Sequence, residues 1–242
     1  MNKQLNLSYT KKQNWVTSFC FINKISFRTL WARKASWFGT FIFACCLLIL
    51  FPFGLGTEAL HRADIQIGTF WIMNEFIAVL VVSRMFAAEQ ECNGMEFLLT
   101  SFIPKSSVVA GKITFTSLQI LSLQLPILVL WVILYNIDFN ILLNLISTLL
   151  TVSLFFNFGS ASLGTLITCL TARSLAKEIL LPMLFFPLQS GILLASVSLT
   201  INIGNNSLLG AFSANAWWTI LIAYPIIFTT LGLILSEILL QE

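Results

Sequence analysis

The chain has 242 residues, of which 57% are hydrophobic and only 10% are charged. Soluble domains carry about 25% charged residues, so this composition excludes an ordinary soluble protein and indicates one whose solvent is lipid. The net charge of +3 does not indicate nucleic-acid binding, and the five cysteines show no CxxC or Cys/His spacing typical of a zinc site or a disulfide framework. We expect one membrane-spanning domain over residues 1–242.

The stretch at residues 14–35 has the pattern of a helix that lies in the membrane interface. Trp15 and Phe19 can share one helical face with other apolar side chains, while Lys24 and Arg28 flank that face. Basic side chains opposite aromatic ones suit the boundary between headgroups and acyl chains. The alternative is a cytosolic tail in which this periodicity arises by chance.

Six further segments are apolar and long enough to cross the hydrocarbon layer, which requires about 20 helical residues. The predicted spans are 37–55, 65–82, 113–135, 140–172, 179–203 and 217–240. The fourth segment is too long for one straight crossing, so we expect part of it to lie at the interface or to bend near Gly159. The expected fold is all-α, with six transmembrane helices, an N-terminal interfacial helix and a cytoplasmic loop between spans 2 and 3.

The distribution of Lys and Arg predicts the orientation of these spans. With the N-terminus inside, twelve of the thirteen basic residues face the cytoplasm and only Arg62 lies outside. The inverted topology would reverse that ratio, whereas membrane proteins retain basic loops in the cytoplasm. Both termini are therefore predicted to be cytoplasmic.

The largest polar interruption between the spans is Ser83–Lys112, which we call the coupling segment. It contains acidic residues, basic residues near both ends and an apolar patch around Phe97 and Leu98. Gly94 can break a helix before the patch, and Pro104 ends it. A charged, partly amphipathic segment between two spans must lie in water or against a soluble partner, so we expect it to receive force from such a partner. The alternative is a solvated loop that carries an interfacial helix.

Asn74 and Glu75 fall in the middle of the second predicted span. A charged carboxylate at bilayer depth is costly, roughly 2.5–3.5 kcal/mol for Asp on insertion scales, and such groups usually face the bundle interior. Two interpretations stay open. Either the pair lines a substrate path or a proton-sensitive contact, or the carboxyl is protonated, or bonded to Asn74 or to another helix, and serves only packing.

The sequence contains none of the common nucleotide-binding or hydrolytic motifs. It has no GxxxxGK[ST] loop, no GxSxG elbow and no HExxH pair. An enzyme that used Glu75 with His61 is disfavoured, because a mid-span residue and a loop residue lie about half a bilayer apart in a regular helix. We therefore expect no catalytic residue, no metal ligand and no stably bound cofactor.

The coupling segment contains a collinear set of residues: Arg84, Phe86, the acidic residues that follow, Gly94, Glu96, Leu98, Pro104, Val108, Val109 and Lys112. With this set it resembles the cytoplasmic loop of the cytochrome c maturation protein B (CcmB) family, the membrane subunits of haem exporters. Further matches are Phe51, Pro52, Gly56 and Glu58 after the first span, Gly68 and Trp71 in the second, and Pro182 and Pro187 in the fifth. The similarity extends from about Trp15 to the C-terminus, whereas Asn74 and Glu75 stand where the family is expected to have small or aliphatic residues.

This resemblance implies a permease subunit of an ABC transporter in the bacterial inner membrane, with ATP hydrolysed by a separate ATPase subunit. The implied complex also contains a haem-handling membrane protein and a small accessory membrane protein. The implied activity is haem export or the ATP-driven release of a haem-loaded periplasmic chaperone, so haem is a transported or handled ligand. The alternative is an ABC-2-type exporter of another lipid-like or drug-like substrate.

Three sets of contacts are thus expected. The N-terminal helix should contact membrane lipid. Asn74 and Glu75 are the intramembrane polar candidates. The positions expected to couple the chain to the ATPase are Arg84, Phe86, Glu89, Glu91, Gly94, Glu96, Phe97, Leu98, Pro104 and Lys112.

Overall fold

The computed structural model describes residues 15–32, 34–56, 62–85, 104–137, 139–171, 177–203 and 216–239, and all regular structure in these ranges is helical. The helices are α1 (Trp15–Ala32), α2 (Lys34–Leu55), α3 (Ala63–Ser83), α6 (Lys105–Leu134), α7 (Phe139–Thr171), α8 (Lys177–Ile203) and α10 (Ala216–Leu239). Six of these helices, all except α1, are long and apolar enough to cross a membrane. The predicted all-α fold with six spans is therefore confirmed, and the position of α1 in the interface remains a prediction.

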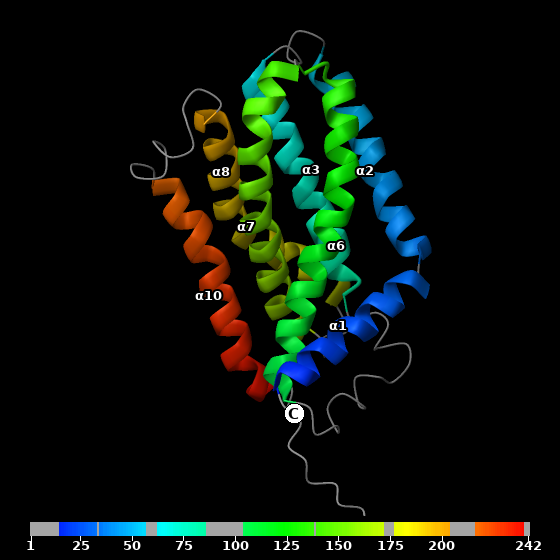
Figure 1. Cartoon of the computed structure of the whole chain (residues 1–242), viewed down its shortest axis with the longest axis vertical. Helices are drawn as coiled ribbons and strands as arrows, with labels where there is room; N and C mark the ends of the chain where they lie inside the picture. Colours follow the sequence, from blue (N-terminus) through cyan, green and yellow to red (C-terminus); the bar gives the residue numbers. More distant parts are fainter. Residues whose placement is uncertain are drawn as a thin grey trace, which may run out of the picture.

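The six long helices form a bundle with α7 near its middle (Figure 1). The shorter α1 crosses one end of the bundle obliquely and packs beside the beginning of α6. The same end holds the beginning of α2 and the end of α3, and we call it the α1 end. The coupling segment leaves α3 and returns to α6 at this end.

Helix α7 packs closely against four other helices, α3, α6, α8 and α10. Every residue from 159 to 168 is buried. A Cβ atom on Gly159 would lie 2.6 Å from Ile192 Cδ1 and 3.0 Å from Tyr224 Cδ1, and one on Gly164 would collide with the side chain of Val82. The helix continues without a break through Gly159. This glycine therefore allows α8 and α10 to approach α7 closely.

An aromatic cluster fixes α3 against three neighbours at the end opposite α1. Trp71 donates a hydrogen bond from Nε1 to Thr200 Oγ1 of α8 at 3.0 Å, and its ring centroid lies 5.2 Å from that of Phe156 on α7. The ring of Phe70 lies 5.0 Å from that of Trp131 on α6. Each such aromatic pair contributes about 0.5–1.5 kcal/mol beyond the burial of its area. The register of α3 is thereby fixed relative to α6, α7 and α8.

Helix α1 is attached to α6 through a second close contact. The side chain of Ile22 packs onto Gly111, where an added Cβ would lie 2.9 Å from Ile22 Cγ2. One residue further along α1, Asn23 Oδ1 accepts a hydrogen bond from Thr114 Oγ1 at 3.2 Å. Since Gly111 has no side chain, the two helix backbones can approach closely. The apolar face predicted for this stretch thus packs at least partly on protein.

Gly164→Val is expected to destabilise the bundle, because the new side chain must displace Val82 at the contact between α3 and α7. Overpacking of this kind costs about 1–3 kcal/mol. The measurement is thermal unfolding of detergent-purified variants. Gly191→Val is the matched control, since nothing lies within 4 Å of a Cβ placed at Gly191. Equal melting of the two variants would contradict the close contact at Gly164.

Candidate functional site

The structure describes only the two roots of the coupling segment, Ser83–Met85 and Pro104–Lys112. Three of the predicted coupling residues, Arg84, Pro104 and Lys112, lie in these roots. The others lie outside the described residues: Phe86, Glu89, Glu91, Gly94, Glu96, Phe97 and Leu98. His61 also lies outside the described residues.

Arg84 joins the end of α3 to the beginning of α2. Its Nη1 donates hydrogen bonds to the main-chain oxygen of Ser36 at 3.2 Å and to the Oγ of the same residue at 3.0 Å. A guanidinium donates charge-assisted hydrogen bonds, which are stronger than neutral ones. Arg84 is also the residue that follows the last turn of α3, where a positive charge interacts favourably with the helix dipole.

Lys112 joins α6 to the same end of α3 from the other root. The residue is buried, and its Nζ donates a hydrogen bond to the main-chain oxygen of Met85 at 3.3 Å. A buried ammonium needs such partners, because it has lost its hydration. Through Arg84 and Lys112, the roots of the coupling segment are bonded to three helices and, through Met85, to each other.

Pro104 fixes the point at which the coupling segment becomes α6. Its carbonyl accepts hydrogen bonds from the backbone nitrogens of Ser107 at 2.9 Å and Val108 at 3.4 Å, and from Ser107 Oγ at 2.7 Å. Because the residue supplies a carbonyl but no N–H, it suits the start of a helix. Helix α6 therefore begins at Lys105, well before residue 113, where the third span was expected to start.

Asn74 and Glu75 lie on α3 inside the bundle, and Glu75 is only 4% exposed. Asn74 Nδ2 donates to the carbonyl of Phe70 on its own helix at 3.1 Å. Among the described residues, neither carboxyl oxygen of Glu75 has a hydrogen-bond partner, and the same is true of Asn74 Oδ1. The possible bond between Glu75 and Asn74 is therefore absent, because Asn74 turns its amide to the backbone.

Two groups of buried amides connect the spans at positions that the sequence reading did not single out. On one side of α7, Gln124 Nε2 of α6 donates to Ser153 Oγ at 2.7 Å, and Gln124 Oε1 accepts from Asn157 Nδ2 at 2.7 Å. Both amide residues are buried. Asn157 Oδ1 has no hydrogen-bond partner among the described residues.

The second group connects α7, α8 and α10. Gln189 Nε2 donates a hydrogen bond to Ser160 Oγ, and Gln189 Oε1 accepts one from the hydroxyl of Tyr224 at 3.2 Å. That hydroxyl also donates a hydrogen bond to the main-chain oxygen of Leu188 at 3.1 Å. Gln189 thus connects Ser160 of α7 to Tyr224 of α10.

A simple signal could have identified these residues. Polar amides are uncommon in apolar spans and usually bond across helices, as Gln124, Asn157 and Gln189 do. A search for charge in the middle of the spans finds only Glu75, and Asn74 was included because it precedes Glu75. Among the described residues no group of three or more His, Cys, Asp or Glu side chains is placed to hold a metal ion. The arrangement of the buried amides holds the helices together.

Lys112→Met is expected to loosen the end of α3, because it removes the ammonium that holds the carbonyl of Met85. A hydrogen bond to a charged group contributes about 1.5–3 kcal/mol, so the amides of Arg84 and Met85 should exchange with solvent at least about tenfold faster. Hydrogen exchange followed by mass spectrometry measures this. Lys105→Met, which removes the same charge from the first turn of α6, is the control. Unchanged exchange in the Lys112 variant would show that another contact fixes this helix end.

Comparison with known protein families shows to which family the chain is related. The family described as CcmB protein matches residues 21–234, a range that begins in α1 and reaches into α10. A search of curated proteins found no match. The family match covers far more than half of the chain and confirms the resemblance seen in the coupling segment. The chain therefore belongs to the CcmB family and is a multi-pass permease subunit of a cytochrome c maturation ABC transporter.

Proposed function

We propose that this chain receives mechanical work from a separate ATPase subunit and uses it to move haem, or to release a haem-loaded periplasmic chaperone. The observation that carries the proposal is the attachment of both roots of the coupling segment. Arg84 holds Ser36 of α2, and Lys112 of α6 holds Met85 at the end of α3. A force on the segment would therefore act on three membrane-spanning helices at once.

The energy must arrive by contact, because the sequence has no loop of the GxxxxGK[ST] type to hold ATP phosphates. In the proposed topology three surfaces face the cytoplasm: helix α1, the stretch Arg173–Lys177 and the coupling segment. Helix α1 is basic and aromatic, which suits lipid headgroups. The stretch Arg173–Lys177 is too short to offer much area. The coupling segment alone combines connection to two spans, an acidic cluster and an apolar patch.

We place both termini and the α1 end on the cytoplasmic side of the inner membrane. Twelve of the thirteen basic residues then face the cytoplasm, as the positive-inside rule requires. The exception, Arg62, forms an ion pair with Asp64 at 2.7 Å. Its hydrogen bond with this carboxylate, and the negative charge beside it, raise the pKa of the Arg62 guanidinium. The one basic residue on the outer side is thus balanced by a neighbouring acid.

The proposed complex has further members. The family relationship supports a haem-handling membrane protein and a small accessory membrane protein beside the ATPase, with haem as cargo rather than as a resident cofactor. Export of another lipid-like or drug-like substrate requires the same architecture but different partners. Identification of the proteins that co-purify in mild detergent distinguishes the two.

For Glu75 we propose a modest role in transport. Its carboxyl is buried without a hydrogen-bond partner among the described residues. An unsatisfied carboxyl at this depth costs stability, so packing alone gives little reason for it. A contact made only in another conformation, with the cargo or with a neighbouring helix, accounts for its presence.

Phe97→Ala with Leu98→Ala is expected to release the ATPase while the permease still inserts. Buried apolar anchors dominate such contacts, with losses of at least about 2 kcal/mol, or roughly 30-fold in affinity. Co-purification of the ATPase at matched membrane levels is the measurement. Glu89→Gln should weaken the complex only slightly, since rim charges mainly set association rate, and Glu96→Gln should lie between. Full retention of the ATPase by the double variant would rule out this patch as the coupling surface.

Glu75→Gln is expected to reduce the assembly of c-type cytochromes without abolishing it. The substitution keeps the shape of the side chain, so an effect of about fivefold or less is expected, equivalent to one hydrogen bond of about 1 kcal/mol. The measurement is haem-stained c-type cytochrome at equal permease level. Asn74→Ala, which leaves the carboxyl in place, is the companion variant. Complete loss of assembly in the Glu75 variant would make this carboxyl essential, and no change would leave it with a packing role.

A further inference from the structure

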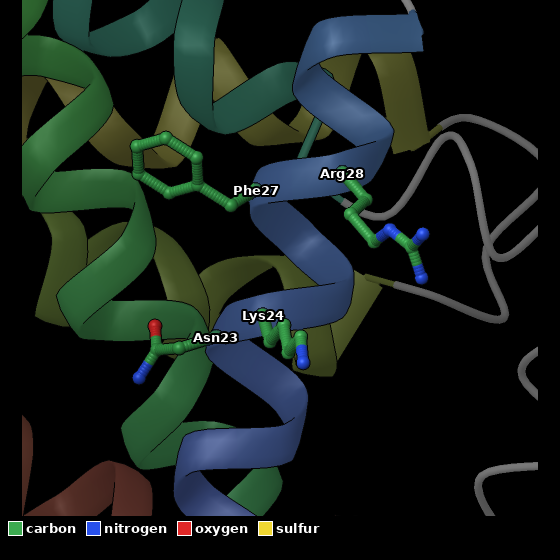
Figure 2. Close-up of a pocket in the computed structure, with 4 residues that line it drawn as sticks. All are labelled: Asn23, Lys24, Phe27 and Arg28. Carbon is green, nitrogen blue, oxygen red and sulfur yellow. The ribbon is translucent and has the colours of Figure 1, made fainter.

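An open pocket of about 640 Å³ lies against α1, and among the described residues it is lined by Asn23, Lys24, Phe27 and Arg28. Figure 2 shows that Asn23 and Phe27 point toward α6, whereas Lys24 and Arg28 point to the opposite side. The pocket therefore has one basic side and one aromatic side. Nothing in the coupling mechanism uses it.

The basic side of the pocket carries two cations one helical turn apart. Lys24 and Arg28 are both exposed, and neither forms a hydrogen bond or an ion pair with any described residue. They differ in this from Arg84 and Lys112, whose donors hold main-chain carbonyls. Side chains at positions i and i+4 of a helix are neighbours, so the pair can hold one anionic group between them.

The aromatic side of the pocket continues onto an apolar surface. Phe27 is half-exposed, and its ring packs edge-on against that of Phe115 of α6, with 6.2 Å between the ring centroids. Further along α6, Leu118, Leu125 and Val129 are also exposed. These side chains follow the helix away from the α1 end, in the direction that acyl chains would take in a bilayer. A ligand that fits both sides has an anionic head and a long apolar tail.

We propose that Lys24 and Arg28 bind the phosphate of an anionic phospholipid whose acyl chains lie along Phe27 and the exposed face of α6. The position supports a lipid, because α1 crosses the end of the bundle (Figure 1), which is the cytoplasmic end of the spans in the proposed topology. Basic residues near a membrane surface attract anionic headgroups. This site goes beyond the proposed coupling function, since it assigns a ligand to a helix outside the coupling segment.

A lipid at this site would also press α1 onto α6. Ile22, which precedes Asn23, packs on Gly111. Gly111 directly precedes Lys112. The lipid would thus stabilise the helix contact beside the residue that holds the end of α3. Anionic lipid should therefore raise the thermal stability of the permease.

The test uses the full-length permease in detergent and a fluorescent short-chain phosphatidylglycerol. Lys24→Gln and Arg28→Gln should each weaken binding about fivefold, and the double variant about 30-fold. The reason is that each basic residue near an anionic headgroup contributes about equally to the binding free energy. The phosphatidylcholine analogue of equal chain length should bind weakly to every variant. Both substituted side chains are exposed, so elution of the double variant at the volume of the unaltered protein confirms its fold.

The matched control is Lys34→Gln with Lys105→Gln, which removes two charges from the same end of the bundle but none from the pocket. This control should keep the affinity of the unaltered permease for phosphatidylglycerol. Equal loss in control and test variants would show attraction to the whole basic end and overturn the site. Equal binding of phosphatidylcholine, or full displacement of the lipid by excess inorganic phosphate, would overturn the assignment to an anionic phospholipid. Unchanged affinity in the double variant would also overturn it.

Discussion

Close packing around α7 is the constraint on which the rest of the bundle depends. Acyl chains are as apolar as leucine, so helices in lipid associate through van der Waals contact and interhelical hydrogen bonds. The centre of α7 meets this requirement with small side chains: Gly159, Ser160, Ala161, Ser162, Gly164, Thr165 and Thr168. Four of the hydroxyls donate to carbonyls one turn earlier on the same helix. Helix α7 therefore offers neighbours a close surface on which these polar groups are already satisfied.

The buried amides act on this framework as connections of defined position. Gln124 reaches Ser153 and Asn157, and Gln189 reaches Ser160 and Tyr224. Hydrogen bonds between membrane helices contribute about 0.6 kcal/mol on average, so they fix register more than they supply stability. The carboxyl of Glu75 makes no such connection, since neither of its oxygens has a partner among the described residues.

The spans could be predicted from the sequence because hydrophobic length is a local property of the chain. Contacts between helices are not local. Arg84 and Lys112 were recognised by charge at the ends of a polar segment, but their partners, Ser36 and Met85, depend on how α2, α3 and α6 meet. The role of Gly111 likewise depends on Ile22 of α1, far away in the sequence.

The same local reasoning explains what was missed inside the bundle. An uncharged amide hardly alters the apolar character of a long run, so Gln124 and Gln189 did not interrupt their spans. Asn74 and Glu75 stood out, yet their sequence neighbourhood suggested a mutual bond that the structure does not contain. In a helix, adjacent side chains point in different directions. Asn74 therefore returns to the backbone at Phe70, and the carboxyl of Glu75 has no hydrogen-bond partner among the described residues.

The attachment of the coupling segment has an unequal effect on the helices it reaches. Helix α3 packs on α7 through Val82 and Gly164, so moving it alone would break this close contact. Helix α2 has few buried residues, and its main contacts among the described residues are with α1, α3 and α6. Arg84 connects this loosely packed helix to the end of α3. In the proposed mechanism, work delivered to the segment would therefore displace α2 at a lower packing cost than α3.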